Sequence, residues 1–485
     1  MNTKSIPIFS AFRVFRSSEI DITPAIGTHL AGDMCRLRPA EKILHPLFAR
    51  ALVAGRSAAP DETSICLLTL DLCTIGNECA AHLRQELARQ FGFRREAVML
   101  HLAQNHSAPS LGGHLFLTPD SPYVSKDFWW VYQGDPNYLD FLAPRLQEVV
   151  QRAIAAMQPV TMACLGRADG RIAHNRRFIK RNGSVQSQPL VDDLFEVLCV
   201  EGPTDPEVGV AVFKNRAGEI TAALLHHTGH PCSHFSSNWV TPSWPGAWCR
   251  AFKQLAGQQC VPLMLNGCCG NINVWSNVPF ERIPADETVA EWLMQSTAAV
   301  LEKLVFTEPS ELACNSVILP MNFADLELQL GRENLAHARQ LLEKHPQPRW
   351  RDQAKTNLDV EWIFAVVAND LHRRIQSTQT YSYEVQAFRL GDLGLVGLIG
   401  EPFVEGQLEI KRQSPAKRTF VAHMCNGYIG YVPTRQSHRA FNYNFLSPEG
   451  SPVRRGANLF LLQEDALERI GAAAIDALKG LFAPP

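Results

Sequence analysis

The sequence has no surplus of charge of either sign and no long apolar run. Its 46 Lys and Arg residues nearly balance 48 Asp and Glu residues, for a formal net charge of -2. A chain without a basic surplus has little attraction for a polyanion, so nucleic acid is not expected as a partner. No stretch approaches the roughly 20 consecutive apolar residues that a spanning helix needs. Stable membrane insertion is therefore not expected either.

The sequence also lacks the features of a secreted, disulfide-bonded protein. From Met1 to Ser18 the apolar runs are short and are broken by Pro7 and Ser10, unlike the continuous apolar stretch of a secretory signal. The 13 cysteines are odd in number and are scattered through apolar runs. Cys268 and Cys269 are adjacent, without the spacer of a zinc knuckle. Reduced thiols and a cytoplasmic location are predicted.

No Ser/Gly-rich linker, charge block or fixed-period repeat divides the 485 residues, so residues 1–485 are expected to form one large domain. Short apolar runs alternate with amphipathic helical patterns. The predicted strands are Ser64–Asp71, Ala97–Ala103, Val208–Lys214, Thr221–His227, Val261–Asn266, Val385–Leu390, Leu393–Ile399 and Thr419–Met424. The predicted helices are Asn77–Gln90, Tyr138–Met157, Pro245–Leu255, Thr288–Val305, Arg332–Lys344, Val360–Gln376 and Gln463–Leu481. This alternation predicts a layered α/β domain with a central mixed sheet covered by helices.

Four of the predicted strands end in segments rich in Gly, Pro and short polar residues. These segments are 104–109, 228–231, 266–273 and 400–402. Open α/β sheets bind ligands at the carboxyl ends of their strands. An active site is therefore expected where these segments meet.

Two histidines and a glutamate in these segments can hold one divalent ion. The candidates are His230, Glu401 and either His106 or a neighbour, because imidazole nitrogen and carboxylate oxygen are the usual ligands of catalytic zinc. Each residue alone is more often a hydrogen-bonded loop residue, and the joint occurrence favours the metal. Tyr428 and Tyr431 stand three residues apart among glycines. They form either a tight turn with aromatic packing, or a site where a phenol near a cation ionises or donates a proton.

Motifs along most of the chain resemble those of one enzyme family. The early segments Asp21–Pro24 and His45–Val53 look like the opening of that family. Six later matches follow in the same order: Asn105–Pro109 with T-H-T-H-S-G-P, Asn175-Arg176 with N-R-S-P, His230-Pro231 with H-P, Gly270–Asn273 with G-D-V-S, Gly400-Glu401 with P-G-E, and Tyr428–Thr434 with Y-x-x-Y-V-T. The sequence thus resembles the neutral/alkaline, non-lysosomal ceramidases.

The resemblance implies a zinc ion held by a His, the His of H-P, the Glu of P-G-E and the second Tyr of Y-x-x-Y. Three of these ligands map onto His230, Glu401 and Tyr431. The remaining ligand falls on Gln104, and the family's substrate-contacting histidine falls on His106. Because an amide oxygen is a poorer zinc ligand than imidazole, either Gln104 binds weakly or His106 or His101 takes its place.

A second departure concerns the nucleophile. Asn273 stands where the family has its active-site Ser, and an amide nitrogen is not a nucleophile. Water activated by the cation can attack instead. The remaining expected roles are His106 as general base or acid, Arg176 as anchor for a carboxylate or oxyanion, and Asn271 or Asn273 as donor to developing charge. Tyr428 is expected as a catalytic group, and Asn105, Asn175 and Asn271 as substrate contacts.

A third departure is size, because the family carries a C-terminal immunoglobulin-like domain and little follows the tyrosine motif here except the predicted helix Gln463–Leu481. We therefore expect a zinc-dependent hydrolase that cleaves an amide- or ester-like bond of a small polar substrate, rather than an ordinary ceramidase. Two alternatives stay open: a metal-assisted lyase or isomerase of a sugar-like substrate, and a catalytically inactive binding protein. A homo-oligomer also stays open.

Overall fold

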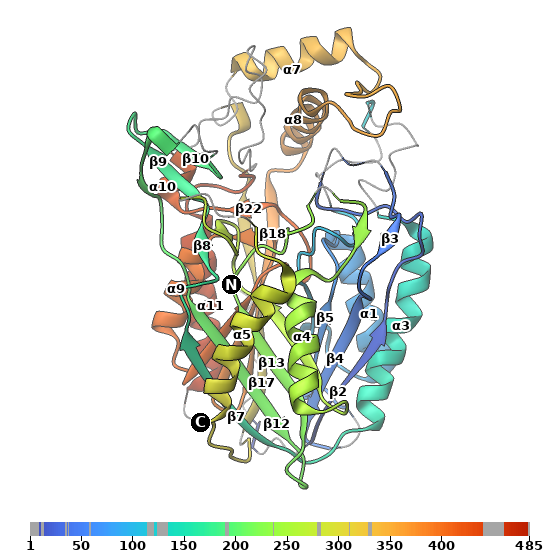
Figure 1. Ribbon diagram of the computed structural model, residues 1–485, viewed down its shortest axis with the longest axis vertical. Helices are drawn as coiled ribbons and strands as arrows, with labels where there is room; N and C mark the ends of the chain where they lie inside the picture. Colours follow the sequence, from blue (N-terminus) through green and yellow to red (C-terminus); the bar gives the residue numbers. More distant parts are fainter. Residues whose placement is uncertain are drawn as a thin grey trace.

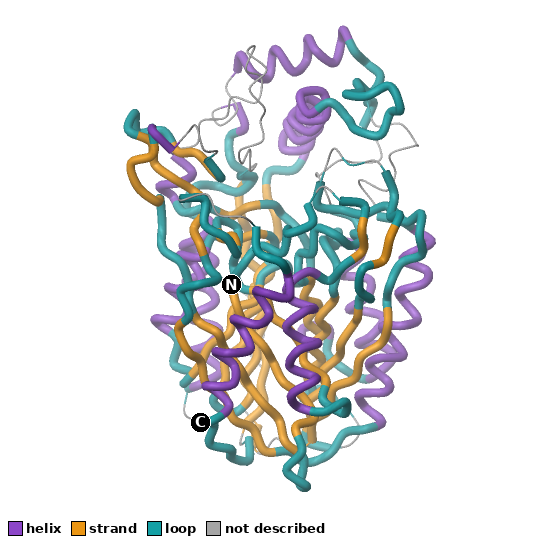
Figure 2. The backbone as a smooth tube through the Cα atoms, viewed as in Figure 1, coloured by secondary structure: helices purple, strands orange, loops and turns teal. Residues whose placement is uncertain are grey.

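The computed structural model describes residues 9–10, 14–33, 36, 38–57, 60–113, 121–123, 134–189, 194–235, 237–278, 283–309, 311–327, 332–439 and 460–483. Three larger sheets of five, four and four strands run through these residues, and helices flank them (Figures 1 and 2). Each of the three sheets is mixed, with one parallel pair among antiparallel neighbours.

The first sheet, in the order β2-β4-β5-β6, comes from the N-terminal part of the chain. Its strands are β2 (Val14–Asp21), β4 (Phe48–Gly55), β5 (Ile65–Leu70) and β6 (Val98–Leu102). Helices α1 (Asn77–Phe91) and α3 (Pro136–Ala155) pack their apolar faces on one side of it. A short 3-10 helix, η1 (Arg95–Ala97), leads into β6.

The second sheet has the order β15-β13-β12-β7. Its strands are β7 (Thr161–Ala168), β12 (Glu207–Lys214), β13 (Ile220–His227) and β15 (Val261–Asn266). Helices α4 (Ser243–Ala256) and α5 (Asp286–Leu301) cover one side of it, and Figure 1 shows both in front of these strands.

The third sheet has the order β1-β17-β18-β19-β21. Its strands are β1 (Phe9–Ser10), β17 (Glu311–Asn322), β18 (Thr380–Leu390), β19 (Leu393–Leu398) and β21 (Arg418–Ala422). Helices α9 (Val404–Gln413) and α11 (Ala466–Phe482) pack on it, and α8 (Val360–Ser377) belongs to the same apolar cluster. Helix α7 (Arg332–Lys344) packs with α8 at one end of the molecule (Figure 1).

Beside the three larger sheets, the described residues form three two-stranded sheets and one three-stranded sheet. They are β14 (Trp239–Val240) with β3 (Lys42–Ile43), β16 (Ile272–Asn273) with β8 (His174–Asn175), β20 (Glu401–Pro402) with β22 (Tyr431–Val432), and a three-stranded sheet of β9 (Arg177–Lys180), β10 (Val185–Ser187) and β11 (Val197–Val200). Helix α10 (Arg435–Arg439) follows β22.

The three large sheets share one apolar core, to which all of them contribute. Phe15, Phe213 and Phe388, one from each sheet, are fully buried in it, and the rings of Phe15 and Phe213 stack at 3.8 Å between centroids. Burying one such side chain contributes on the order of 1.5–3 kcal/mol. The layered α/β class with helix-covered mixed sheets is confirmed. The expected central sheet is divided into three, because a strand that is apolar on both faces can be covered by another sheet as well as by a helix.

No helix among the described residues is long and apolar enough to cross a membrane.

Candidate active site

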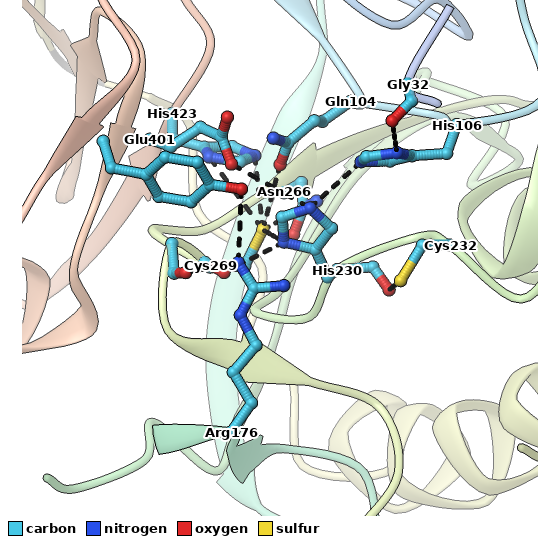
Figure 3. A network of polar contacts seen from close by, with 12 residues as sticks. Gly32, Gln104, His106, Arg176, His230, Cys232, Asn266, Cys269, Glu401 and His423 are labelled. Atoms are coloured by element: carbon cyan, nitrogen blue, oxygen red, sulfur yellow. Dashed lines mark hydrogen bonds and ion pairs between the residues drawn. The ribbon is translucent and has the colours of Figure 1, made fainter. Parts of the chain in front are cut away.

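The carboxyl ends of several strands bring their polar side chains together. His106 follows β6, His230 follows β13, and Glu401 begins β20 just after β19. Their side chains point toward one region, together with that of Arg176 (Figure 3). All four side chains are more than nine-tenths buried. The segments that were expected to form a site at the strand ends therefore do meet.

The imidazoles of His106 and His230 face each other through the same ring atom. Their Nε2 atoms are 3.0 Å apart, and the ring centroids are 4.9 Å apart. The opposite ring nitrogens point at backbone oxygens: His106 Nδ1 lies 3.1 Å from Gly32 O, and His230 Nδ1 lies 3.1 Å from Cys269 O. A carbonyl oxygen only accepts a hydrogen bond, so each Nδ1 carries the hydrogen. In the neutral rings both Nε2 atoms are then acceptors.

Two acceptor nitrogens at this distance repel each other unless a proton or a metal ion lies between them. Burial lowers the pKa of His230 well below its ordinary value, and the positive charge of Arg176 lowers it further, so an added proton is disfavoured. A metal ion is the other positive charge that two Nε2 atoms can share. This pair of rings is thus suited to hold a cation.

Glu401 stands beside the imidazole pair. Its Oε2 lies 3.9 Å from His230 Nε2 and has no hydrogen-bond partner, whereas its Oε1 accepts a 2.7 Å bond from the Tyr428 hydroxyl. Burial raises the pKa of Glu401, and the hydrogen bond from Tyr428 opposes that rise. A buried carboxylate oxygen without a partner is costly unless a proton or a cation meets it.

Backbone pairing sets Glu401 next to Tyr431. Strands β20 and β22 are parallel with Glu401 opposite Tyr431, so the two side chains emerge on the same face. The approach requires glycine, because Gly400 has φ +72° and a Cβ there would stand 2.5 Å from Gly430 O. Burial raises the pKa of the Tyr428 and Tyr431 hydroxyls well above the ordinary value, so both phenols are protonated at neutral pH.

Arg176 brings a buried positive charge to the site. Its Nη2 donates to Gly270 O at 2.6 Å and to the Tyr431 hydroxyl at 3.3 Å, and its Nε has no partner. Within the described residues it forms no ion pair with a carboxylate. An unpaired guanidinium in a buried site is suited to bind an anionic group.

Gln104 and Cys269 are bonded to each other next to His230. Gln104 has φ +64°, and its Oε1 accepts a 3.3 Å bond from the Cys269 thiol. Cys269 Sγ also lies 3.6 Å from His230 Nδ1 and 3.6 Å from His423 Nε2. Burial raises the pKa of this thiol well above its ordinary value, so it is neutral. Cys269 is not among the site residues that the sequence predicts.

His101 is bonded to the backbone through both ring nitrogens. Its Nδ1 lies 2.7 Å from His423 O, and its Nε2 accepts from Asn266 N at 3.0 Å. No lone pair is left for a metal, so His101 is not available as the missing ligand.

Three of the expected substrate contacts use their amides to hold loops. Asn105 and Asn175 each accept from the backbone N–H two residues ahead, at 3.1 and 3.0 Å, and donate to the carbonyls of Thr241 and Pro203. Asn271 accepts from Val404 N at 2.9 Å and donates to Glu405. These partners fix the loops around the site.

Asn273 differs, because one of its amide atoms has no partner. Its backbone pairs in parallel with that of His230, and its Nδ2 donates to Gln188 Oε1 at 3.2 Å. Its Oδ1 is buried without a hydrogen bond. Gln188, which the sequence did not single out, has φ +52° and donates its backbone N–H to Arg176 O at 2.7 Å.

Within the described residues, no three His, Cys, Asp or Glu side chains form a metal-binding group. Glu401 Oε2, 3.9 Å from His230 Nε2, would therefore have to turn toward the His106–His230 pair to join it in holding a cation, and a phenol or an amide would supply a further donor.

Known proteins resemble this chain in structure and not in sequence. No protein-family model and no curated protein matches the sequence. Two solved structures resemble the fold at 16% identity and a TM-score of 0.65: the neutral ceramidase from Pseudomonas aeruginosa, with 97% of this chain and 74% of that chain covered, and a ceramidase complexed with C2, with 98% and 75% covered. That residues 1–485 form a single domain stays a prediction. The chain therefore has a ceramidase-like fold over nearly its whole length.

Proposed function

We propose that the chain is a zinc-dependent hydrolase that cleaves an amide- or ester-like bond of a small polar substrate, with water as the nucleophile. The observation that carries the proposal is the pair of facing Nε2 atoms of His106 and His230 beside the unpartnered Oε2 of Glu401. The ceramidase-like fold supports a hydrolase of this general kind.

The proposed ligands are His106, His230, Glu401 and Tyr431. His106 replaces the expected Gln104, because its Nε2 faces that of His230 while Gln104 Oε1 is bonded to the Cys269 thiol. Bound zinc acidifies water and polarises a carbonyl oxygen. Gly32 O and Cys269 O fix the two imidazole orientations through their Nδ1 hydrogens.

The remaining residues orient the substrate. Arg176 offers its Nε to a carboxylate or to the oxyanion that develops during hydrolysis, since this atom has no protein partner. Tyr428 holds Glu401 through the 2.7 Å bond to Oε1, which leaves Oε2 directed to the cation. Asn273 has no nucleophilic atom, so an acyl-enzyme of the serine type is not part of the proposal.

Metal content and solvent-oxygen incorporation test the proposal together. The full chain, purified without added metal and then supplied with zinc, is assayed against a panel of N-acyl amino acids and the corresponding acyl esters in heavy-oxygen water. The expected result is about one equivalent of zinc and one solvent oxygen in the released acid. Turnover without solvent oxygen would favour the lyase or isomerase. Absence of zinc binding and of turnover would favour the inactive binding protein.

A further inference from the structure

Three buried polar atoms around His230 lack a protein partner: Arg176 Nε, Asn273 Oδ1 and Glu401 Oε2. Buried polar atoms in folded proteins are nearly always hydrogen-bonded. In the proposed function, Glu401 Oε2 binds the cation and Arg176 Nε binds an anionic group of the substrate. The Asn273 oxygen has no role in the proposed function.

Asn273 lies next to His230, one of the proposed zinc ligands. Its backbone pairs with that of His230 in parallel, so the two side chains leave on the same side. It is fully buried. Asn105, Asn175 and Asn271 have both amide ends bonded to the protein, and Asn273 has only its Nδ2 so bonded.

Gln188 holds Asn273 in this orientation. Its Oε1 accepts from Asn273 Nδ2, which turns Asn273 Oδ1 away from Gln188. Gln188 itself has a left-handed backbone with φ +52°, and its N–H is bonded to Arg176 O. Left-handed residues other than glycine are uncommon and are found most often where function requires them. The strained Gln188 and the unpartnered Asn273 oxygen are independent observations at one place.

We propose that Gln188 and Asn273 form a neutral subsite that accepts a hydrogen bond from the substrate, through Asn273 Oδ1, next to the bond that is cleaved. The substrate then carries an N–H or O–H donor beside its acyl group, so an amide is selected over the isosteric ester. This inference rests on the proposed function for the place of the cleaved bond. It reverses the expected role of Asn273, which becomes an acceptor instead of a donor.

Two probes that differ in one atom test the subsite. N-acetylglycine and O-acetylglycolate share the acetyl and carboxylate groups, and differ only in an amide N–H against an ester oxygen. Their dissociation constants are measured on the full chain by ligand-observed NMR titration, before and after removal of metal by a chelator. The wild type is expected to bind the amide at least about 10-fold more tightly, because the ester oxygen offers a lone pair to an acceptor.

Matched variants assign the preference to the proposed atom. In Asn273→Leu, which has no acceptor, the ratio of the two constants should fall to about 1, whereas Asn273→Asp keeps an acceptor and should keep the ratio. Gln188→Ala should lower the ratio of the two dissociation constants and leave the zinc content unchanged. A ratio near 1 in the wild type, a preference for the ester, or a full preference in Asn273→Leu would overturn the proposal. So would failure of the wild type to bind either probe.

The same samples separate this inference from the proposed function. A ratio near 1 in wild-type protein that binds zinc and hydrolyses its substrate would overturn the subsite alone. An intact ratio in protein that neither binds zinc nor hydrolyses would overturn the hydrolase and leave the subsite standing.

Discussion

Two pairs of buried histidines lie near each other in this protein and are bonded in opposite ways. In the pair His106 and His230, the Nδ1 atoms face carbonyl oxygens and the Nε2 atoms face each other at 3.0 Å. In the pair His101 and His423, the ring centroids are 6.4 Å apart and both nitrogens of His101 are bonded to the backbone. Burial alone therefore does not identify a metal ligand. The direction of the remaining lone pair does.

The largest expected effect is on zinc affinity. His230→Ala should weaken zinc binding by more than about 100-fold, because one of few ligands of a buried ion is lost. His101→Asn should leave the affinity within about threefold, since His101 has no lone pair to give. Competition with a chromophoric chelator measures both affinities. An equal loss of zinc affinity in the two variants would contradict the claim that His230 is a zinc ligand and His101 is not.

The second effect concerns the pH dependence of stability. Burial lowers the pKa of His101 from 6.5 to about 4. At pH values between these two, His101 is protonated in the unfolded chain and neutral in the folded chain. Stability should therefore fall as pH falls through this range, by about 3 kcal/mol from His101. His101→Gln should remove that share. Urea unfolding of both proteins at several pH values measures it, and parallel curves would contradict the neutral buried state of His101.

The smallest expected effect comes from Gly32, whose backbone oxygen orients the His106 ring. A Cβ on Gly32 would stand 2.5 Å from His106 Nδ1, and Gly32 has φ +97°. Gly32→Ala should displace the ring and its bond to Gly32 O, lowering zinc affinity by about 10- to 100-fold. Gly27 is the matched control, because its φ is +95° and nothing lies within 4 Å of a Cβ there. Gly27→Ala should share the backbone strain and keep the zinc affinity, whereas equal zinc affinities in the two variants would refute the steric argument.

The sequence predicts much of the site because the ends of its strands can be located from the pattern of apolar residues. The predicted strand Val261–Asn266 coincides with β15, and Thr221–His227 differs from β13 by one residue. Residues that follow such strands converge in space, and His230 and Glu401 could be paired on that ground. The strand β17 is not predicted, since Asn315 and Ser316 interrupt its apolar pattern.

The choice among His101, Gln104 and His106 could not be made from sequence. It depends on carbonyls that lie far along the chain, Gly32 O for His106 and His423 O for His101. Residue type and spacing carry no information about such partners.

The asparagines show the same limit. The amides of Asn105 and Asn175 close local turns, which any Asn before a loop can do, and sequence does not separate that use from substrate contact. Gln188 gives no signal at all, because its left-handed backbone and its bond to Asn273 arise only in the fold.

The most direct test of the central claim is the zinc-edge X-ray absorption spectrum of the full chain loaded with one equivalent of zinc. We expect two imidazole ligands, from His106 and His230, with oxygen ligands and no sulfur. A spectrum with a single imidazole, a sulfur ligand from Cys269, or no bound zinc would contradict it.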